Sequence, residues 1–274
     1  MIIEGPLRPL ATGRTAEILA LDDERVLKLY LDSVDRGLIE AEHANSEAAS
    51  GCGATPVVCH GLVEHAGRPG LVFDALTGAS LTEMAERNLL RLAESGRILA
   101  RTHHALHQHS GQRFPEARQA MAALLDTPPM AFLSDAARAR ARAQILALAA
   151  GDRLLHMDFH TQNVFAHRGG YAVIDWQTTL CGAPAADVAC TMFLLAEAEL
   201  WPGIPLLKQL LYNAVRRLLR RAYYAEYKRL SGMTDDAVAA WRLPILVNRL
   251  AGWNIESERP RLSAELERLL EGSV

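Results

Sequence analysis

The sequence has no uninterrupted run of about 18 apolar residues, so it predicts no membrane-spanning helix. Its first ten residues, MIIEGPLRPL, lack the basic residues and apolar core of a secretory signal, and we expect none. Neither sign of charge dominates, because 29 Lys and Arg residues stand against 32 Asp and Glu residues, a net charge of −3. This balance gives no basic field for nucleic acid and no acidic excess typical of disorder.

Cysteine is scarce, with 4 residues among 274, and no C-x-x-C pair occurs. All four lie among apolar or small residues, which indicates reduced, mostly buried thiols of a cytoplasmic protein. Internal repeats are absent as well. Half of the residues are apolar, which suffices for a core in one large domain or in two lobes.

Strand patterns fill much of the first 75 residues. Segments 16–21 and 25–31 flank a turn-like Asp-Asp-Glu and predict a hairpin, and segments 57–65 and 69–76 predict a second one. Between the hairpins, residues 35–50 predict a helix that glycines end. The chain therefore begins with a sheet that carries one helix.

The remainder of the chain is mainly helical. Ser80 and Glu83 form a capping-box pattern, and two further helices are predicted over residues 88–109 and 138–149. Short strands follow, and helices resume after Pro184; the strands are expected at 153–157, 163–167 and 171–175. This order predicts an α+β protein with a small N-lobe, residues 1–76, and a larger helical C-lobe, residues 77–274.

Polar side chains gather in HMDFHTQN, residues 156–163, and in VIDW, residues 173–176. If the loop between the two predicted strands comprises residues 168–170, Asn163 and Asp175 lie directly opposite, with Cβ atoms about 5 Å apart. A two-residue turn would shift the register by one residue and spoil that match. Oxygen donors at such a spacing suit Mg²⁺.

These two motifs resemble the catalytic and metal-binding motifs of the aminoglycoside phosphotransferase, choline kinase and fructosamine kinase group. The usual form is H-G-D-x-x-x-x-N, followed by I-D-W or I-D-F. Here Met157 stands where glycine is common, and Thr161-Gln162 where Pro-Gly often stands. The resemblance spans residues from about 8 to 190 and implies a protein-kinase-like fold of two lobes, a sheet-based N-lobe and a mainly helical C-lobe.

The resemblance implies a role for each polar residue of the motifs. Asp158 would accept or orient the proton of the substrate hydroxyl, mainly by orientation, because a carboxylate of pKa about 4 is a weak base. Asn163 and Asp175 would hold Mg²⁺. His160 would help to neutralise the γ-phosphate, and His156 would steady the loop.

Asp187 has two interpretations. By resemblance it anchors the backbone of the catalytic loop from a following helix. By position alone it is a first-turn helix acid after Pro184, favoured by the helix dipole. The sequence leaves both open.

The resemblance also requires a lysine on the third strand of the N-lobe, and Lys28 stands there among apolar neighbours. Its partner would be Glu40 or Glu42 of the following helix. At about 100° per residue, Glu42 shares the apolar face and Glu40 lies across from it. We therefore choose Glu42; the face comprises Leu38, Ala41, Glu42, Asn45, Ala48 and Ala49.

The remaining nucleotide contacts follow from the resemblance alone. The turn in ATGRTA, residues 11–16, contains Gly13 but no G-x-G-x-x-G motif, and its backbone N–H groups would cradle phosphate. Backbone groups from Asp74 to Leu76, between the lobes, would contact adenine.

Two histidine patterns have alternative interpretations. H-x-D-x-H, residues 156–160, could be a metal-ligand run of a hydrolase, but no second His-rich motif accompanies it. His103 and His107 have the i, i+4 spacing of a zinc site. However, His103 lies in an apolar helical stripe and no acidic third ligand accompanies the pair, which favours packed histidines.

Residues 208–229 carry seven Lys or Arg residues against one Glu, interleaved with tyrosines. A nucleic-acid or membrane face is conceivable. The apolar stripe of Leu207, Leu211 and Leu218 instead predicts an amphipathic helix with a solvated basic face.

We therefore expect a phosphotransferase that passes the γ-phosphate of ATP, or GTP, to a hydroxyl of a small molecule with the help of Mg²⁺. The acceptor would be of aminoglycoside, sugar or amino-alcohol type; nucleic acid and membrane are not expected partners. A polycationic acceptor would require an acidic pocket, for which the C-lobe offers Glu197, Glu199, Glu256 and Glu258.

Two rival functions remain. One is a non-catalytic, nucleotide-binding regulatory module on the same fold, although such a module need not keep Asp158. The other is a protein kinase. Only 12 positions separate Asp175 from Asp187, which leaves no obvious room for a long activation segment with its A-P-E end.

Overall fold

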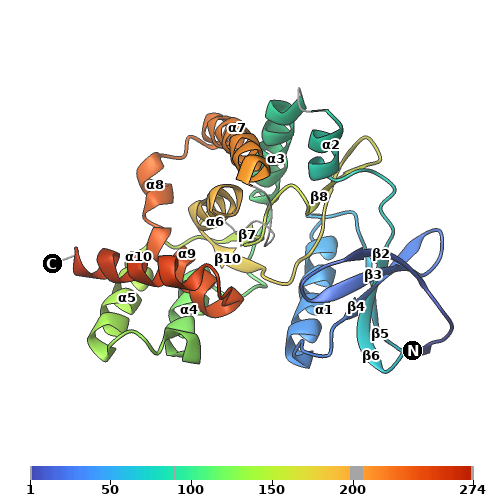
Figure 1. Ribbon diagram of the computed structural model, residues 1–274, viewed down its shortest axis with the longest axis horizontal. Coiled ribbons are helices and arrows are strands. Elements are labelled where there is room, and N and C mark those ends of the chain that lie inside the picture. The colour runs from blue at the N-terminus through green and yellow to red at the C-terminus, as the bar shows by residue number, and fades with distance from the viewer. Residues whose placement is uncertain (1, 89–90, 198–205, 273–274) are drawn as a thin grey trace. The chain divides into compact units, whose positions relative to one another are not determined.

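The computed structural model describes residues 2–88, 91–197 and 206–272; side chains of 206–211 are not described. The chain forms two compact units (Figure 1). Unit 1 comprises residues 1–83 and 161–179, and unit 2 comprises residues 84–160 and 180–274. No helix among the described residues has both the length and the apolar character needed to cross a bilayer.

Unit 1 is built on a six-stranded sheet with the order β1-β5-β6-β4-β3-β2, antiparallel except where β1 pairs with β5. Both predicted hairpins are confirmed, as β3–β4 and β5–β6. The strands β1 and β2 were not predicted individually. Their bounds are β1 Ile2–Ile3, β2 Arg8–Thr12, β3 Ala16–Ala20, β4 Arg25–Tyr30, β5 Cys59–His65 and β6 Arg68–Asp74.

Helix α1 (Arg36–Gly51) begins at Asp35, whose carboxylate caps the helix by accepting from Gly37 N at 2.8 Å. Ile39 of α1 packs with Tyr30 and Leu71 of the sheet in one buried cluster. The predicted apolar face was rotated by one position, since Leu38 is 50% exposed whereas Ile39 is fully buried. Figure 1 shows α1 beside the strands.

A second small sheet completes unit 1. It is the hairpin of β8 (Val164–His167) and β9 (Gly170–Val173). Thr55 Oγ1, which follows α1, donates to Val173 O at 2.7 Å, and Asn45 Nδ2 of α1 donates to Trp176 O at 3.0 Å. These bonds hold residues 173–176 against the N-terminal sheet-and-helix body.

The chain enters unit 2 through helix α2 (Leu81–Arg87). The capping box at its start is confirmed, because Glu83 N donates to Ser80 Oγ at 3.2 Å and Ser80 N to Glu83 Oε2 at 2.9 Å. Unit 2 also contains a two-stranded sheet of β7 (Arg153–Leu155) and β10 (Leu180–Gly182). Its helices are α3 Leu92–Leu106, α4 Ala117–Ala123, α5 Asp135–Ala147, α6 Pro184–Ala196, α7 Leu206–Ser231, α8 Asp235–Ala239, α9 Arg242–Asn248 and α10 Arg259–Glu271, with short 3₁₀ turns at Leu124–Asp126 and Pro128–Met130.

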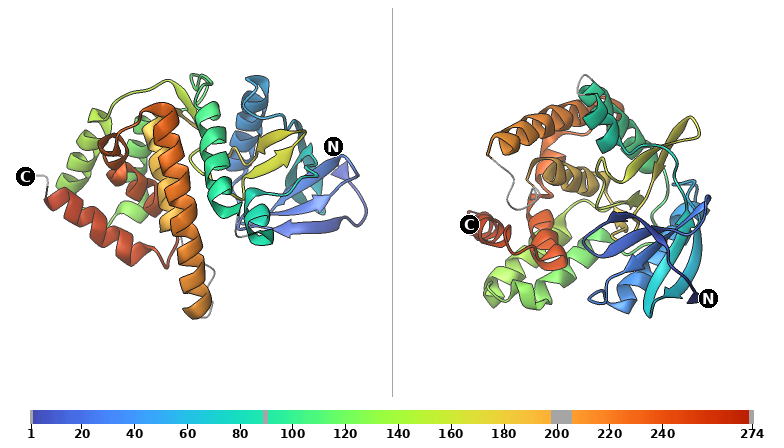
Figure 2. Two further views of the ribbon diagram at one scale, coloured as in Figure 1. Left: turned by 90° about the horizontal axis from the view of Figure 1, so that it is seen from above. Right: turned by 45° about the vertical axis from the view of Figure 1, so that its right-hand side comes forward.

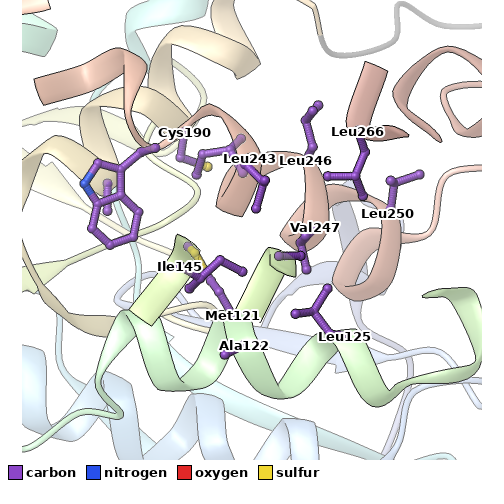
Figure 3. Close-up of a cluster of buried hydrophobic side chains, with 14 of the residues drawn as sticks. Met121, Ala122, Leu125, Ile145, Cys190, Leu243, Leu246, Val247, Leu250 and Leu266 are labelled. Carbon is purple, nitrogen blue, oxygen red and sulfur yellow. The ribbon is translucent and has the colours of Figure 1, made fainter. Parts of the chain in front are cut away.

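The core of unit 2 lies between α4, α5, α6, α9 and α10. In Figure 3, Met121 and Leu125 of the α4 region face Leu246 and Leu250 of the α9 region. A π-helical turn, Arg249–Trp253, follows α9 and ends at Asn254 in the left-handed conformation, with φ of 47°. Such turns are frequent at functional sites.

Helix α7 runs along α3, as both views of Figure 2 show. It is amphipathic as predicted, but its apolar stripe is not the predicted one. Leu218 is 48% exposed, and Leu207 and Leu211 have side chains outside the described residues. The buried positions are instead Leu219, Tyr223 and Tyr227, so aromatic residues replace leucines on the face toward α3.

Candidate functional site

Lys28 of strand β4 lies in a polar cluster within unit 1. Its Nζ is 2.5 Å from Glu42 Oε1 and 2.9 Å from Asp175 Oδ1, and the residue is only 9% exposed. Burial alone would lower the pKa of Lys28, but the two carboxylates outweigh it and raise the pKa. The side chain is therefore an ammonium throughout the physiological range.

The helix-face argument correctly distinguishes the two glutamates of α1. Glu42 is buried against Lys28, whereas Glu40 is exposed and pairs with Arg36 at 3.0 Å. Tyr30 was not predicted as part of this cluster, yet its hydroxyl donates to Glu42 Oε2 at 2.7 Å. The i, i+2 spacing of Lys28 and Tyr30 on one strand was the available signal, because alternate residues share a face.

Asn163 and Asp175 flank the β8–β9 hairpin, but they are not directly opposite. His167 pairs with Gly170, so the turn comprises two residues, Arg168 and Gly169, both with positive φ. The three-residue loop on which the direct match depended therefore does not form. Ile174 N donates to Asn163 O at 3.0 Å, and Asp175 lies one residue beyond the pair with φ of 68°. Because this left-handed residue leaves the pleat, its side chain does not follow the alternation of the strand.

Three other predicted nucleotide contacts, Gly13, Asp74 and Leu76, also lie in unit 1, whereas His160 lies in unit 2. Gly13 N donates to Ala16 O at 2.8 Å and closes the β2–β3 turn. At the end of β6, Asp74 N donates to Val58 O at 3.1 Å and Ala75 N to Glu24 O at 2.7 Å. Leu76 follows Ala75, and its N–H forms no hydrogen bond with another of the described residues.

Asp158 lies in unit 2, in a loop that follows β7. It is 9% exposed, and His160 Nε2 approaches its Oδ2 at 3.5 Å. Just before it, Met157 is buried and has φ of 63°, the left-handed conformation that glycine adopts without strain. The departure from the glycine of the usual motif thus falls at a position where the backbone favours glycine.

One face of helix α6 holds this loop by its backbone. Asp187 accepts from His156 N at 2.5 Å and from Met157 N at 2.9 Å. Cys190 Sγ donates to Met157 O at 3.0 Å, and Thr191 Oγ1 donates to Phe159 O at 2.9 Å. The i, i+3, i+4 spacing of the three α6 side chains places them on one face.

Asp187 satisfies both interpretations, since it lies in the first turn of α6 and also anchors the loop. Burial would raise the pKa of this carboxyl, but His103 and His107 hold it well below its usual range. His103 Nε2 lies 3.0 Å and His107 Nε2 3.3 Å from Asp187 Oδ2. The sequence offers no acidic residue near the histidine pair, but Asp187, 80 positions after His107, supplies one in the folded chain.

The H-x-D-x-H interpretation gains no support. His156 is fully buried, and its Nδ1 accepts from Asp158 N at 3.3 Å, a contact within the loop itself. Among the described residues, the group of His, Cys, Asp and Glu side chains close enough to share an ion is His103, His107 and Asp187. It does not include His156.

The candidate residues therefore fall into two sets. Unit 1 carries Lys28, Glu42, Asn163 and Asp175, and unit 2 carries Asp158 with its supporting helix. Each set is held by buried polar contacts rather than displayed on a solvated loop.

This chain is similar in sequence to one protein family and in fold to several solved structures. Residues 6–233 match the family model described as the phosphotransferase enzyme family. A search of curated proteins gives no significant match.

Solved structures with similar folds include the aminoglycoside phosphotransferase APH(4)-Ia, with a TM-score of 0.64 and 17% identity over 98% of this chain and 94% of that one. An aminoglycoside-3'-phosphotransferase of type VIII has a TM-score of 0.58 and 14% identity, covering 90% and 92% of the two chains. ADP-bound APH(2'')-Ib has a TM-score of 0.52 and 14% identity, covering 97% and 92%. At these identities the likeness establishes the fold, which is protein-kinase-like.

Proposed function

Because the chain belongs to the phosphotransferase enzyme family, we propose that this kinase transfers the γ-phosphate of ATP, with Mg²⁺, to a hydroxyl of a small molecule. One observation carries the proposal: a buried lysine is fixed between two carboxylates from distant parts of the chain, Glu42 and Asp175. A buried ammonium that is already charged and held in place suits the binding of phosphate oxygens.

On the nucleotide side, Lys28 binds the phosphates, and Glu42 with Tyr30 keeps its side chain extended. Gly13 lies in the turn whose backbone approaches phosphate, and the edge from Asp74 to Leu76 contacts adenine. The N–H groups of Asp74 and Ala75 are already bonded within the sheet, so Leu76 N–H is the donor that we assign to the base. GTP is the other candidate nucleotide, since one solved relative is a GDP and kanamycin complex.

Asn163 and Asp175 supply the donors for Mg²⁺. Their amide and carboxylate oxygens match the oxygen ligands that this ion takes from proteins, with phosphates and water completing the shell. When bound, the ion neutralises charge on the phosphate oxygens. Asp175 also contacts Lys28, so one carboxylate orients the ammonium and contributes to the metal site.

On the acceptor side, Asp158 orients the hydroxyl and receives its proton late in the transfer, and His160 adds positive charge toward the γ-phosphate. The support for Asp158 is the rigidity of its loop, which α6 holds at four backbone groups. Positioning of this kind supplies most of the protein's part in phosphoryl transfer.

For the acceptor class, we favour hydroxyl compounds of low positive charge, such as sugars, over polycations. Glu197 accepts from Arg242 at 2.7 Å and from Arg261 at 2.6 Å, and Glu258 is buried against Arg249 at 2.7 Å. Two of the four acids that could attract a polycation are thus neutralised by arginine. Glu256 is exposed, and Glu199 lies outside the described residues.

The test begins with calorimetric titration of ATP with Mg²⁺ and with EDTA, followed by ADP release with a neutral sugar, an amino alcohol, kanamycin and hygromycin B. We expect Mg²⁺-dependent binding and ADP release above background with a neutral acceptor. Absence of Mg²⁺-dependent nucleotide binding would refute the proposal. Binding without turnover on a broad panel would favour the regulatory module instead.

Variants then separate the two sets of residues. Asp158→Asn should abolish turnover yet leave nucleotide affinity within about twofold, because it removes an acceptor contact and no nucleotide contact. Asp175→Asn should weaken Mg²⁺-dependent nucleotide binding. Asp152→Asn, which alters an exposed acid just before β7, is the matched control and should change neither quantity.

A further inference from the structure

Two buried histidines of α3 have no role in the chemistry proposed above. His103 and His107 lie one helical turn apart, are 0% and 3% exposed, and have ring centroids 4.2 Å apart. Imidazoles buried so completely need partners for both ring nitrogens, and the polar neighbours of both rings come from two sides, helix α7 and Asp187.

On one side the partners come from helix α7. Tyr223 Oη lies 2.8 Å from His103 Nδ1, and Tyr227 Oη lies 2.6 Å from His107 Nδ1. The two helices approach closely because α3 carries Gly96 at the crossing, where a Cβ would lie 2.7 Å from Leu219 O. Burial raises the pKa of both tyrosines, so each phenol keeps its proton and is able to donate it to Nδ1.

On the other side both rings face Asp187. A ring whose Nδ1 accepts from tyrosine carries its N–H on Nε2, which lies within 3.3 Å of Asp187 Oδ2 in both histidines. His107 Nε2 makes a long hydrogen bond to this oxygen at 3.3 Å, whereas His103 Nε2, at 3.0 Å, is not aligned well enough to form one. The tyrosines thereby fix the tautomer that presents N–H to the carboxylate.

Asp187 in turn holds the amides of His156 and Met157, the residues directly before Asp158. We propose that Tyr223 and Tyr227 are positioning residues for phosphoryl transfer: through His103 and His107 they fix the carboxylate that holds the catalytic loop. The inference rests on the function proposed above, and it extends the support of Asp158 to a helix that begins some 50 positions after it in the chain.

Two imidazoles and a carboxylate also form a zinc donor set, and the ligand atoms lie within 4.8 Å of one another. Hydrogen bonding explains the approach of the histidines to Asp187 better than zinc binding does. Asp187 Oδ2 already accepts from His156 N at 2.5 Å, and His107 Nε2 forms a hydrogen bond to the same oxygen, so this oxygen already has two hydrogen-bond donors.

The decisive variants remove one oxygen each. Tyr227→Phe and Tyr223→Phe keep the packed rings, and each should lower kcat about tenfold while the KM for ATP stays within twofold, as expected for a misplaced loop. Tyr224→Phe is the matched control, because its hydroxyl, on the same helix, bonds Asp235 at the surface. It should leave kcat unchanged.

A rescue experiment identifies the contact that matters. His107→Gln places an amide N–H where Nε2 faces Asp187, whereas His107→Leu offers no donor. We expect the glutamine variant to keep most of the activity and the leucine variant to lose it. Equal losses in the two variants would overturn the proposed path through His107.

Amide hydrogen exchange of His156 and Met157, read by NMR, supplies a measurement that needs no turnover. Both amides should exchange faster in Tyr227→Phe than in wild type and Tyr224→Phe, and ¹⁵N shifts of the imidazoles should report the Nε2–H tautomer. If wild type releases no ADP, the proposed function fails, and this readout alone decides the inference. Unchanged exchange in both tyrosine variants, or stoichiometric zinc in the purified protein, would overturn it.

Discussion

Met157 offers a test of backbone strain, because its residue type and its conformation disagree. Its φ of 63° is left-handed, and its side chain is 1% exposed in the core of unit 2. An L-residue in this conformation is strained by about 1–2 kcal/mol. Truncating a buried methionine to alanine costs about 2–5 kcal/mol. Met157→Ala should therefore be clearly destabilised, with the strain still present.

Met157→Gly loses the same side chain but relieves the strain. After the greater flexibility of glycine in the unfolded chain, about 0.5–1 kcal/mol, is subtracted, the glycine variant should be more stable than the alanine variant by roughly 0.8 kcal/mol. Met121 is the control: it is equally buried in the same cluster but lies inside helix α4. At this helical position, the free energy of unfolding of Met121→Ala should be greater than that of Met121→Gly by about 1 kcal/mol.

The assay is urea unfolding of the four variants, compared by midpoint at equal m-value. The expected double difference is about 2 kcal/mol, with opposite signs of the Ala-to-Gly change at the two sites. If alanine is the more stable residue at both positions, Met157 is not strained in the folded protein and the argument from its φ fails.

Three further predictions follow from buried groups. Tyr30→Phe removes the donor 2.7 Å from Glu42 Oε2 and should lower the free energy of unfolding by about 1.5–3 kcal/mol in urea titrations; a change as small as that of Tyr224→Phe would contradict it. His103 has its pKa lowered to about 3 by burial and by His107. Between about pH 3 and pH 6.5, this imidazole is therefore protonated in the unfolded chain but not in the folded chain. Stability should thus fall as pH drops from about 6.5, by up to about 1.4 kcal/mol per pH unit, and His103→Gln should flatten that slope, whereas an unaltered slope would exclude this residue as its source. With a thiol reagent, native protein should label rapidly at Cys52, which is exposed, and the other three cysteines only on unfolding; rapid labelling of several thiols would show that the cores are open.

The sequence allowed the elements to be predicted where local patterns decide the outcome. Alternation gave both hairpins of the large sheet, and helical periodicity placed Glu42 rather than Glu40 against Lys28. The match of Asn163 with Asp175 depended on the length of a turn that the sequence does not determine. The turn that forms, Arg168-Gly169, moves the register by one residue, which changes the faces.

Contacts between distant segments lay beyond reach for a different reason. Asp187 meets His103 and His107 only because the fold brings the C-terminal end of α3 to the first turn of α6, and no local pattern encodes that approach. The aromatic face of α7 was misassigned for a related reason. Leucine is expected at buried positions more often than tyrosine, because a buried tyrosine hydroxyl needs a hydrogen-bond partner. Here an imidazole supplies that partner for each tyrosine.

Unit 1 is built from two separate stretches of the chain, residues 1–83 and 161–179, and this affects how it folds during synthesis on the ribosome. Residues 1–83 emerge first, yet Asp175 and the β8–β9 hairpin belong to the same unit. At about 5–20 residues per second, roughly 5–20 s pass between the synthesis of residue 83 and that of residue 179, the last residue of the unit, 96 positions later. Until then Lys28 lacks one of its two carboxylates and Thr55 lacks its acceptor, so unit 1 is completed only after most of α3 to α5 has left the ribosome.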